Sequence, residues 1–168
     1  NDWGWLRGQL NYDKTTTLVF YPHGNLILVR DKVESEFKLT TRDVCLLNEI
    51  LDAWASEEYI PLFVCEGNSQ QKIKSIEGSH YLSVIYREVY QNIGEKLVIY
   101  GWGLGKQDEY ILKRIVKSSV KSIAVSVYGN DQAYCNHVIS AIHQVINPSR
   151  VKVEFFASDS PGCWNNFD

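Results

Sequence analysis

Residues 101–105 (Gly-Trp-Gly-Leu-Gly) are the first feature of the sequence that could do chemistry. They lie between a predicted strand at 96–100 and a predicted helix. Glycines at such a turn let the backbone approach a ligand closely, and free amides at the start of a helix favour phosphate. The third glycine of a complete dinucleotide fingerprint would fall at Lys106. A tight turn without a ligand is therefore the second interpretation of this segment.

Three side chains with acid–base chemistry lie near the ends of predicted strands. His23 follows a predicted strand at 17–21, and imidazole is the side chain best suited to move protons near neutral pH. Glu66 follows a predicted strand at 61–65, and Asp108 lies in the first turn of the helix after the glycine-rich segment. Each carboxylate either contacts a ligand or starts a helix, where it contributes roughly 0.3–1 kcal/mol. His23 has two structural alternatives, a surface histidine of a turn or a hydrogen-bonded histidine beneath the sheet.

The elements that must position these residues follow an alternating pattern. β-branched and aromatic runs alternate with helical patterns over the second half of the chain, which predicts βαβ crossovers and a mostly parallel sheet with helices on both faces. Ligands of such α/β sheets bind beyond the carboxyl ends of the strands. We therefore expect His23 with Gly24, Glu66 with Gly67, and the glycine-rich segment to converge on one cleft. Residues 1–157 are predicted to form one domain, and 158–168 an irregular docked tail.

Composition and charge exclude several classes of protein. The 168 residues are 45% hydrophobic and 22% charged, which is ordinary for a globular domain and argues against intrinsic disorder. No apolar run approaches the roughly 18–20 residues that span a bilayer. The net charge of −3 disfavours nucleic acid and anionic lipid as partners. Because no signal segment is visible, we expect a cytoplasmic location.

The four cysteines are widely and irregularly spaced and form no Cys-x-x-Cys pair, so we expect no metal site. The sequence also contains no Met and begins with Asn1, which predicts a fragment of a longer polypeptide. A missing amino-terminal portion is then the first expected partner of this chain. The sequence leaves a homo-oligomer open.

Three segments carry a resemblance to a known family. Residues 20–26 (Phe-Tyr-Pro-His-Gly-Asn-Leu) resemble the Leu-His-Gly segment of sirtuin-related proteins, and residues 99–108 resemble their later Tyr-Gly-x-Ser-Leu-x-x-x-Asp segment. Residues 61–67 are similar to a bacterial branch known as a domain of unknown function. The similarity covers residues 18–156, about the carboxyl-terminal half of a sirtuin-like domain.

The resemblance implies a Rossmann-like fold, here an incomplete domain, that binds NAD or an ADP-ribose-like nucleotide. Active members of the family break the nicotinamide–ribose bond, either to deacylate lysine or to hydrolyse NAD. His23 matches the family histidine that acts as a base on a ribose hydroxyl. The matching strand-end motif makes Gly101, Gly103 and Asp108 nucleotide contacts. Together with the residues singled out above, the expected nucleotide contacts are Gly24, Glu66, Gly67, Gly101, Trp102, Gly103 and Asp108.

Two departures from the family pattern bear on activity. Gly103 stands where the family has Ser, and the amino-terminal Gly-Ala-Gly loop is absent from this chain. The isolated chain is therefore expected to be incomplete as an enzyme. We weigh an NAD hydrolase, which the resemblance connects with bacterial anti-phage effectors, against a non-catalytic nucleotide-binding or protein-interaction module. A methyl-donor-binding domain is a third alternative, suggested by the glycine-rich segment.

Overall fold

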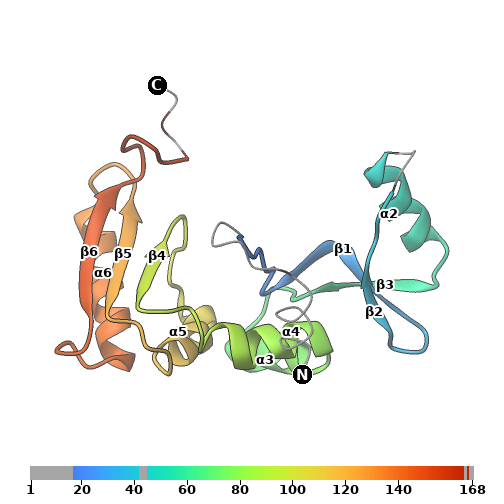
Figure 1. The fold of residues 1–168 in the computed structure, drawn as a ribbon, viewed down its shortest axis with the longest axis horizontal. Helices are drawn as coiled ribbons and strands as arrows, with labels where there is room; N and C mark the ends of the chain where they lie inside the picture. Colours follow the sequence, from blue (N-terminus) through green and yellow to red (C-terminus); the bar gives the residue numbers. More distant parts are fainter. Residues whose placement is uncertain (1–16, 42–44, 165, 167–168) are drawn as a thin grey trace.

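The computed structural model describes residues 17–41, 45–164 and 166. Two three-stranded sheets lie at opposite ends of the molecule in Figure 1, with the helices α3 (Ser69–Glu77) and α4 (His80–Val84) between them. One sheet is parallel and the other is antiparallel. The predicted α/β class, with a parallel sheet consistent with a Rossmann-like fold, is confirmed.

The parallel sheet is built from the second half of the chain. Its strands are β4 (Lys96–Ile99), β5 (Ser122–Val127) and β6 (Lys152–Ala157), in the order β4-β5-β6. The helix α5 (Glu109–Ile115) connects β4 to β5, and α6 (Gln132–Val145) connects β5 to β6. A parallel pair needs such a crossover, and the sequence supplies a helical pattern at both places.

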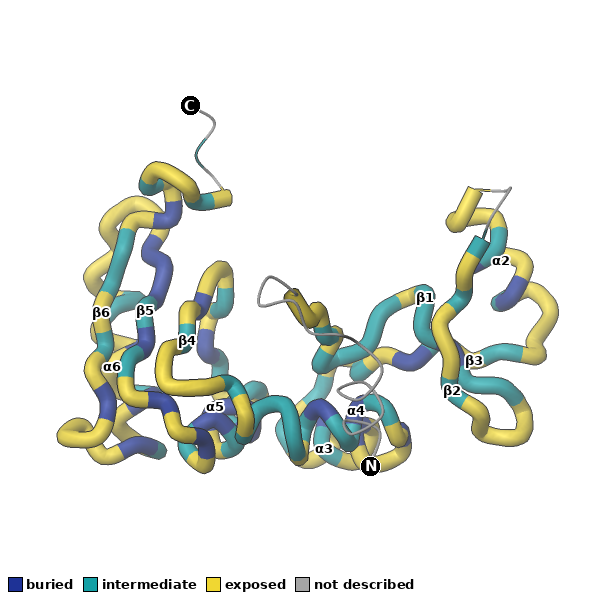
Figure 2. The backbone as a smooth tube through the Cα atoms, in the orientation of Figure 1, coloured by how far each residue is buried: buried dark blue, intermediate teal, exposed yellow. Residues whose placement is uncertain are grey.

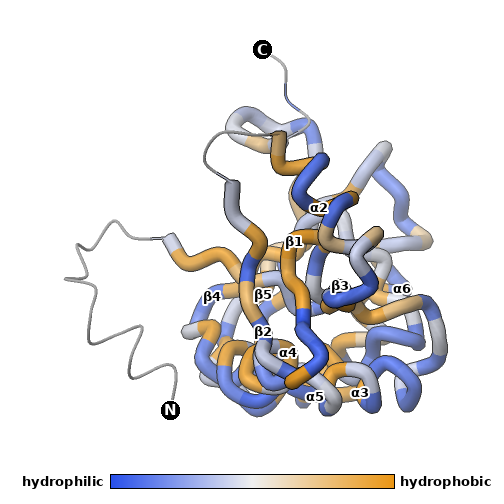
Figure 3. The backbone as a smooth tube through the Cα atoms, turned by 90° about the vertical axis from the view of Figure 1, so that its right-hand side faces the viewer, coloured by the Kyte–Doolittle hydropathy of each residue, from blue (hydrophilic) through white to orange (hydrophobic). Residues whose placement is uncertain are grey.

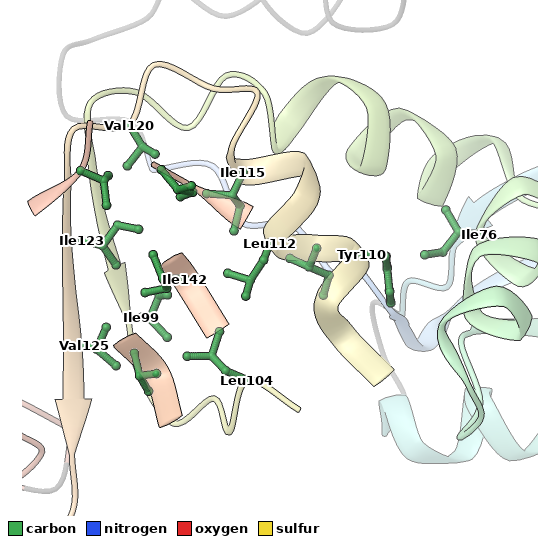
Figure 4. Packing of buried hydrophobic residues seen from close by; sticks show 14 of the residues in the cluster. Ile76, Ile99, Leu104, Tyr110, Leu112, Ile115, Val120, Ile123, Val125 and Ile142 are labelled. Atoms are coloured by element: carbon green, nitrogen blue, oxygen red, sulfur yellow. The ribbon is translucent and has the colours of Figure 1, made fainter. Parts of the chain in front are cut away.

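Alternating burial shows which face of the parallel sheet is covered. Ile123 and Val125 on β5 are fully buried against apolar residues of α5 and α6, as Figure 4 shows. Buried stretches along β5 are also visible in Figure 2. On the opposite face, the side chain of Val98 is 65% exposed and Glu154 is also exposed. Strand side chains alternate between the two faces of a sheet, so these exposed residues mark the uncovered face. Within the described residues, helices therefore cover one face of the parallel sheet, whereas we expected helices on both faces.

The antiparallel sheet corrects two expectations from the sequence. It consists of β2 (Glu36–Lys38), β1 (Gly24–Asp31) and β3 (Tyr59–Phe63), in the order β2-β1-β3. We expected a strand at 17–21, but these residues are not in a strand and β1 begins after His23. The sequence also predicted one mostly parallel sheet, whereas these strands form a separate antiparallel sheet.

A short turn explains the antiparallel pairing. The carboxylate of Asp31 accepts hydrogen bonds from the backbone N–H groups of Val33 (2.9 Å) and Ser35 (2.8 Å). This turn reverses the chain within a few residues, so β1 and β2 pair as a hairpin. The connection is far too short for the crossover that a parallel pair requires.

The helix α2 (Leu46–Ala55) contributes Ile50 and Ala53 to the buried residues beside this sheet, where Val29 of β1 is fully buried. Figure 3 shows the hydrophobic stretch of β1. Leu47 and Leu51 lie on the other side of α2 and are more than half exposed. This lobe therefore has a small core of its own.

Each of the two helices between the sheets begins at a capping side chain. Asn68 and Gln71 form a reciprocal capping box at the start of α3, and the Ser79 hydroxyl accepts from the backbone N–H of Leu82 at the start of α4. A π-helical segment, η1 (Ile85–Val89), continues α4. These caps satisfy backbone donors that the helices leave unpaired.

The residues after β6 contain turns and bends but no helix or strand as far as residue 164. The backbone N–H of Ser158 donates to the carbonyl oxygen of Val127 (2.8 Å), which fixes the start of this segment to β5. In the part of the chain that the structure describes, no helix combines the length and the apolar character needed to cross a membrane.

Gly24 is predicted to contribute strongly to the stability of the fold. Its φ is +73°, and a Cβ at this position would lie 1.8 Å from the carbonyl oxygen of Leu62 on β3. Gly24→Ala should lower the free energy of unfolding by more than about 2 kcal/mol, because both the backbone conformation and the space exclude a side chain. Urea denaturation measures this loss.

Gly129→Ala is the matched control. Gly129 also has a positive φ, +61°, but no heavy atom lies within 4 Å of the point that a Cβ would occupy. Its substitution should lower the free energy of unfolding by only about 1 kcal/mol. Equal losses for both variants would show that the contact with Leu62 contributes nothing.

Candidate functional site

A cavity of about 400 Å³ lies at the carboxyl ends of the three parallel strands; we call it the sheet-end cavity. The glycine-rich segment after β4 contributes one wall, and the ends of β5 and β6 and the start of α6 contribute the others. This is where open α/β sheets bind their ligands. The lining residues are Tyr100, Gly101, Trp102, Gly103, Ser126, Tyr128, Asp131, Tyr134 and Ser158.

Neighbouring elements hold the glycine-rich segment in place. Gly101 has a φ of +69°, and its backbone N–H donates to the hydroxyl of Ser126 on β5 (3.2 Å). The hydroxyl of Tyr134 on α6 donates to the carbonyl oxygen of Trp102 (2.5 Å). His137 Nε2 lies 3.1 Å from the carbonyl oxygen of Leu104. The segment is therefore anchored to both β5 and α6 before any ligand binds.

Ser158 gives the sheet-end cavity a polar atom that needs a partner. The residue is 5% exposed, and its buried hydroxyl has no hydrogen-bond partner among the described residues. The carbonyl oxygen of the same residue accepts from the hydroxyl of Tyr100 (2.7 Å). A buried hydroxyl without a partner is unfavourable by about 1–3 kcal/mol, so the site suits a ligand with hydroxyl or phosphate oxygens.

A second cavity of about 510 Å³ runs along the outer edge of β4; we call it the histidine cavity. It shares Tyr100 and Trp102 with the sheet-end cavity, so these two aromatic residues lie where the cavities adjoin. His23 and Asp108 line it with them. The other lining residues are Tyr21, Pro22, Gly24, Tyr90, Leu97, Val98, Ile99, Ile111 and Ile115.

His23 is held from two sides. Its Nε2 lies 2.5 Å from the hydroxyl oxygen of Tyr110 on α5, and its carbonyl oxygen accepts from the backbone N–H of Val64 (2.8 Å). Tyr110 is itself buried, and this burial raises the pKa of its hydroxyl. The hydroxyl therefore stays protonated at neutral pH and can either donate to Nε2 or accept from it, according to the tautomer of the ring.

Burial, and after it three charged neighbours, set the pKa of His23. Burial lowers the pKa of His23 below its ordinary value of 6.5. The carboxylates of Asp108 and Glu66 oppose this shift, whereas the ammonium group of Lys72 adds to it. The ring is therefore neutral at pH 7 and able to accept a proton.

Asp108 is paired rather than free. Its Oδ1 lies 2.8 Å from Nζ of Lys72 on α3, and the two side chains are 15% and 7% exposed. Breaking a buried pair by removing one partner leaves a buried charge without compensation. Asp108 therefore joins α3 to the start of α5, in addition to lining the histidine cavity.

The structure brings together some of the predicted site residues and leaves others apart. His23, Gly24, Trp102 and Asp108 line the histidine cavity. Gly101 and Gly103 line the adjoining sheet-end cavity, together with Trp102. Glu66 is exposed, and neither it nor Gly67 lines either cavity. The cap of α3 is Asn68 and not Glu66, whose charge nevertheless reaches His23. The ligand contacts assigned to these residues stay predictions.

Sequence reasoning missed three residues that shape the two cavities. Tyr110 and Lys72 lie on helix faces that the sequence presents as ordinary core and surface positions, and Ser158 falls in the segment predicted to be an irregular tail. A signal for Ser158 did exist, because it follows a strand of the parallel sheet directly. Nothing in the sequence pairs Lys72 with Asp108 or Tyr110 with His23.

The described part of the chain contains no group of three His, Cys, Asp or Glu side chains that could hold a metal ion. Cys45 and Cys65 are exposed, and Cys135 and Cys163 are partly buried.

Comparison with known proteins gives a family match. A family model described as a domain of unknown function (DUF4917) matches residues 1–164. No curated protein and no solved structure shows a significant match. The expected relationship to a domain of unknown function is thus confirmed, and the sirtuin-like relationship stays a prediction.

Burial of His23 predicts a pH dependence of stability. Between its folded-state pKa and 6.5, the unfolded chain binds more protons at this residue than the folded chain does. The free energy of unfolding should therefore rise with pH through this window. His23→Gln should remove the contribution of His23 to this rise. Urea denaturation over a pH series measures the free energy of unfolding at each pH. His143→Gln, on an exposed position of α6, is the control and should leave the His23 contribution in place. An unchanged slope in His23→Gln would contradict the prediction.

Removing the hydroxyl of Ser158 and removing that of Ser126 should have different effects on the free energy of unfolding. Ser158→Ala removes a buried hydroxyl without a partner, so the free energy of unfolding of the ligand-free protein should stay constant or rise by about 1 kcal/mol. Ser126→Ala removes the acceptor of the Gly101 N–H and should lower it by about 1–2 kcal/mol. Thermal or urea unfolding distinguishes the two. A loss in Ser158→Ala as large as that in Ser126→Ala would show that the Ser158 hydroxyl is already satisfied.

Proposed function

The chain belongs to the DUF4917 family, a family of domains of unknown function, and we propose that it binds NAD or an ADP-ribose-like nucleotide across the sheet-end and histidine cavities. One observation carries this proposal. Ser158, whose buried hydroxyl has no partner among the described residues, and the glycine-rich segment line one cavity at the carboxyl ends of the parallel strands, and Trp102 and Tyr100 connect it with the cavity of His23.

The sheet-end cavity offers contacts that fit the hydroxyl and phosphate groups of a nucleotide. The Ser158 hydroxyl is buried beside this cavity, so a change of its side-chain rotamer would let it donate to a ligand oxygen, and the glycine backbone at 101 and 103 leaves room for close approach. The aromatic side chains of Trp102, Tyr128 and Tyr100 provide flat apolar surface for a ring. These are the kinds of groups that orient a nucleotide in a largely apolar pocket.

The histidine cavity supplies a base for the chemistry that the resemblance implies. In the tautomer with the proton on Nε2, His23 donates to the Tyr110 hydroxyl and leaves Nδ1 to accept a proton. A neutral imidazole can take this proton from a ribose hydroxyl or a water while the bond between nicotinamide and ribose breaks. Hydrolysis of NAD, as in sirtuin-related anti-phage effectors, is the finer form of this proposal.

A second candidate is nucleotide binding without turnover. Gly103 lacks the hydroxyl that the resembling motif carries, and the carboxylate of Asp108 is engaged by Lys72. The histidine and sheet-end cavities therefore offer fewer polar groups for a reaction, whereas the sheet-end cavity itself is still available for binding. In this case the domain is a nucleotide-binding or protein-interaction module.

Binding and turnover should be measured separately. Isothermal titration of the protein with NAD and with ADP-ribose measures binding, and chromatographic detection of released nicotinamide measures turnover. Ser158→Ala should weaken binding about tenfold. His23→Ala should leave binding within a few-fold and lower any turnover by about 100-fold or more.

His143→Ala is the matched control for His23→Ala, because it removes an imidazole from an exposed position of α6 that lines neither cavity. It should change neither quantity. Binding without turnover in the wild type selects the second candidate. If neither nucleotide binds the wild-type protein, the proposal is wrong in both forms.

A further inference from the structure

A third cavity, separate from the two described above, carries an inference independent of the proposed function. It has a volume of about 440 Å³ and lies between the turn joining α3 to α4, the segment η1 and the helix α5. We propose that it binds a small organic phosphate through Arg87 and Arg114; we call it the arginine cavity. Its lining residues are Glu77, Gly78, Ser79, His80, Ser83, Tyr86, Arg87 and Arg114, none of which lines the other two cavities.

Arg114 is held in position without a carboxylate partner. Its guanidinium carbon lies 4.2 Å from the centroid of the Tyr86 ring, and the side chain is partly buried. Within the described ranges, it forms no ion pair with any Asp or Glu. Stacking on an aromatic ring restricts a guanidinium while leaving its N–H donors available, so less conformational freedom is lost when it binds an anion.

Arg87 brings a second guanidinium to the same cavity. Its Nε donates to the carbonyl oxygen of Ser83 (3.3 Å), which leaves the two terminal nitrogens for another acceptor. Like Arg114, it has no carboxylate partner in the part of the chain that the structure describes. Arg30 on β1 donates to the carbonyl oxygen of Gly78 (2.8 Å) and adds a third positive charge beside the cavity.

The acidic groups near this cavity do not neutralise the two arginines. Glu77 lines the cavity but forms no ion pair with Arg87 or Arg114 in the described residues. The carboxylate of Glu36 accepts from the backbone N–H groups of His80 (3.1 Å) and Tyr81 (2.7 Å). Glu36 therefore compensates the start of α4 rather than the guanidinium groups.

The charge and geometry favour phosphate over carboxylate. A phosphate ester carries a charge near −2 at neutral pH and offers three acceptor oxygens, which can serve two guanidinium groups at once. A carboxylate carries one charge and offers two oxygens, so it would satisfy one guanidinium in a bidentate pair. The volume leaves space for an organic group beyond the phosphate, as expected of a small-molecule site.

Ribose 5-phosphate and inorganic phosphate are suitable probes, with ribose as the uncharged control. Isothermal titration should show saturable binding of ribose 5-phosphate and no binding of ribose. Nuclear magnetic resonance should place the perturbed amide signals at residues 78–87. The double variant Arg87→Gln/Arg114→Gln should weaken binding by more than about tenfold.

Lys117→Gln is the matched control, since it removes one positive charge from an exposed residue just after α5 that lies outside the cavity. It should leave the affinity within about twofold at fixed ionic strength. Arg87→Lys and Arg114→Lys, tested singly, retain the charge and should bind more weakly than the wild type but more tightly than the matching Gln variants.

Three results would overturn the proposal. The first is no saturation by ribose 5-phosphate at about 10 mM with the wild-type protein. The second is equal weakening in Lys117→Gln, which would indicate a general charge effect. The third is unchanged binding in the double variant while its thermal unfolding matches that of the wild type, which would place the site elsewhere. Ser158→Ala, which should weaken nucleotide binding, should leave the binding of ribose 5-phosphate unchanged, and this separates the site from the proposed nucleotide site.

Discussion

The ion pair between Lys72 and Asp108 connects the two halves of the molecule. Lys72 belongs to α3, which follows the antiparallel sheet, and Asp108 lies at the start of α5, which follows the first parallel strand. The hydroxyl of Ser69 strengthens the same connection by donating to the carbonyl oxygens of Lys106 and Gln107 (both 3.1 Å). Burying two paired charges brings little net stability, but removing one of them leaves the other buried without compensation, which is strongly destabilising. The pair therefore fixes one arrangement of the halves, and the histidine cavity between them depends on that arrangement.

Local sequence signals predicted the parallel half of the fold well. Each crossover helix and each strand from Lys96 onward has a periodic apolar pattern, and the caps at Asn68 and Ser79 are visible in the sequence. The antiparallel half was predicted less well because strand partners are decided by tertiary contacts. The apolar run at 17–21 resembles a strand, yet the residue that pairs with Phe63 is Gly24, whose missing side chain lets β3 approach. A pattern of β-branched residues does not contain that information.

The candidate site, like the fold, was predicted in part from the sequence. His23, Trp102 and Asp108 line one cavity. The sequence suggested this for His23 and Asp108, because both lie near the ends of predicted strands. In the structure, however, His23 precedes a strand instead of following one. The partners that set the properties of His23 are remote in sequence: Tyr110 lies 87 residues away from it. Residue type and spacing can identify a candidate proton acceptor. Its pKa, however, depends on burial and on charges that only the folded chain brings near it.

Packing also relates the arginine cavity to His23. The ring of Tyr86 lies 4.2 Å from the guanidinium carbon of Arg114 and 5.8 Å, between centroids, from the ring of Tyr110. The hydroxyl of Tyr110 in turn contacts His23. Arg114 and Tyr110 both project from α5, so the helix that holds the histidine also carries the anion-binding group. Spatial continuity alone does not establish coupling between two sites. It does impose a shared constraint, because any movement of α5 that brings Arg114 closer to a bound phosphate must also move the hydroxyl that orients His23.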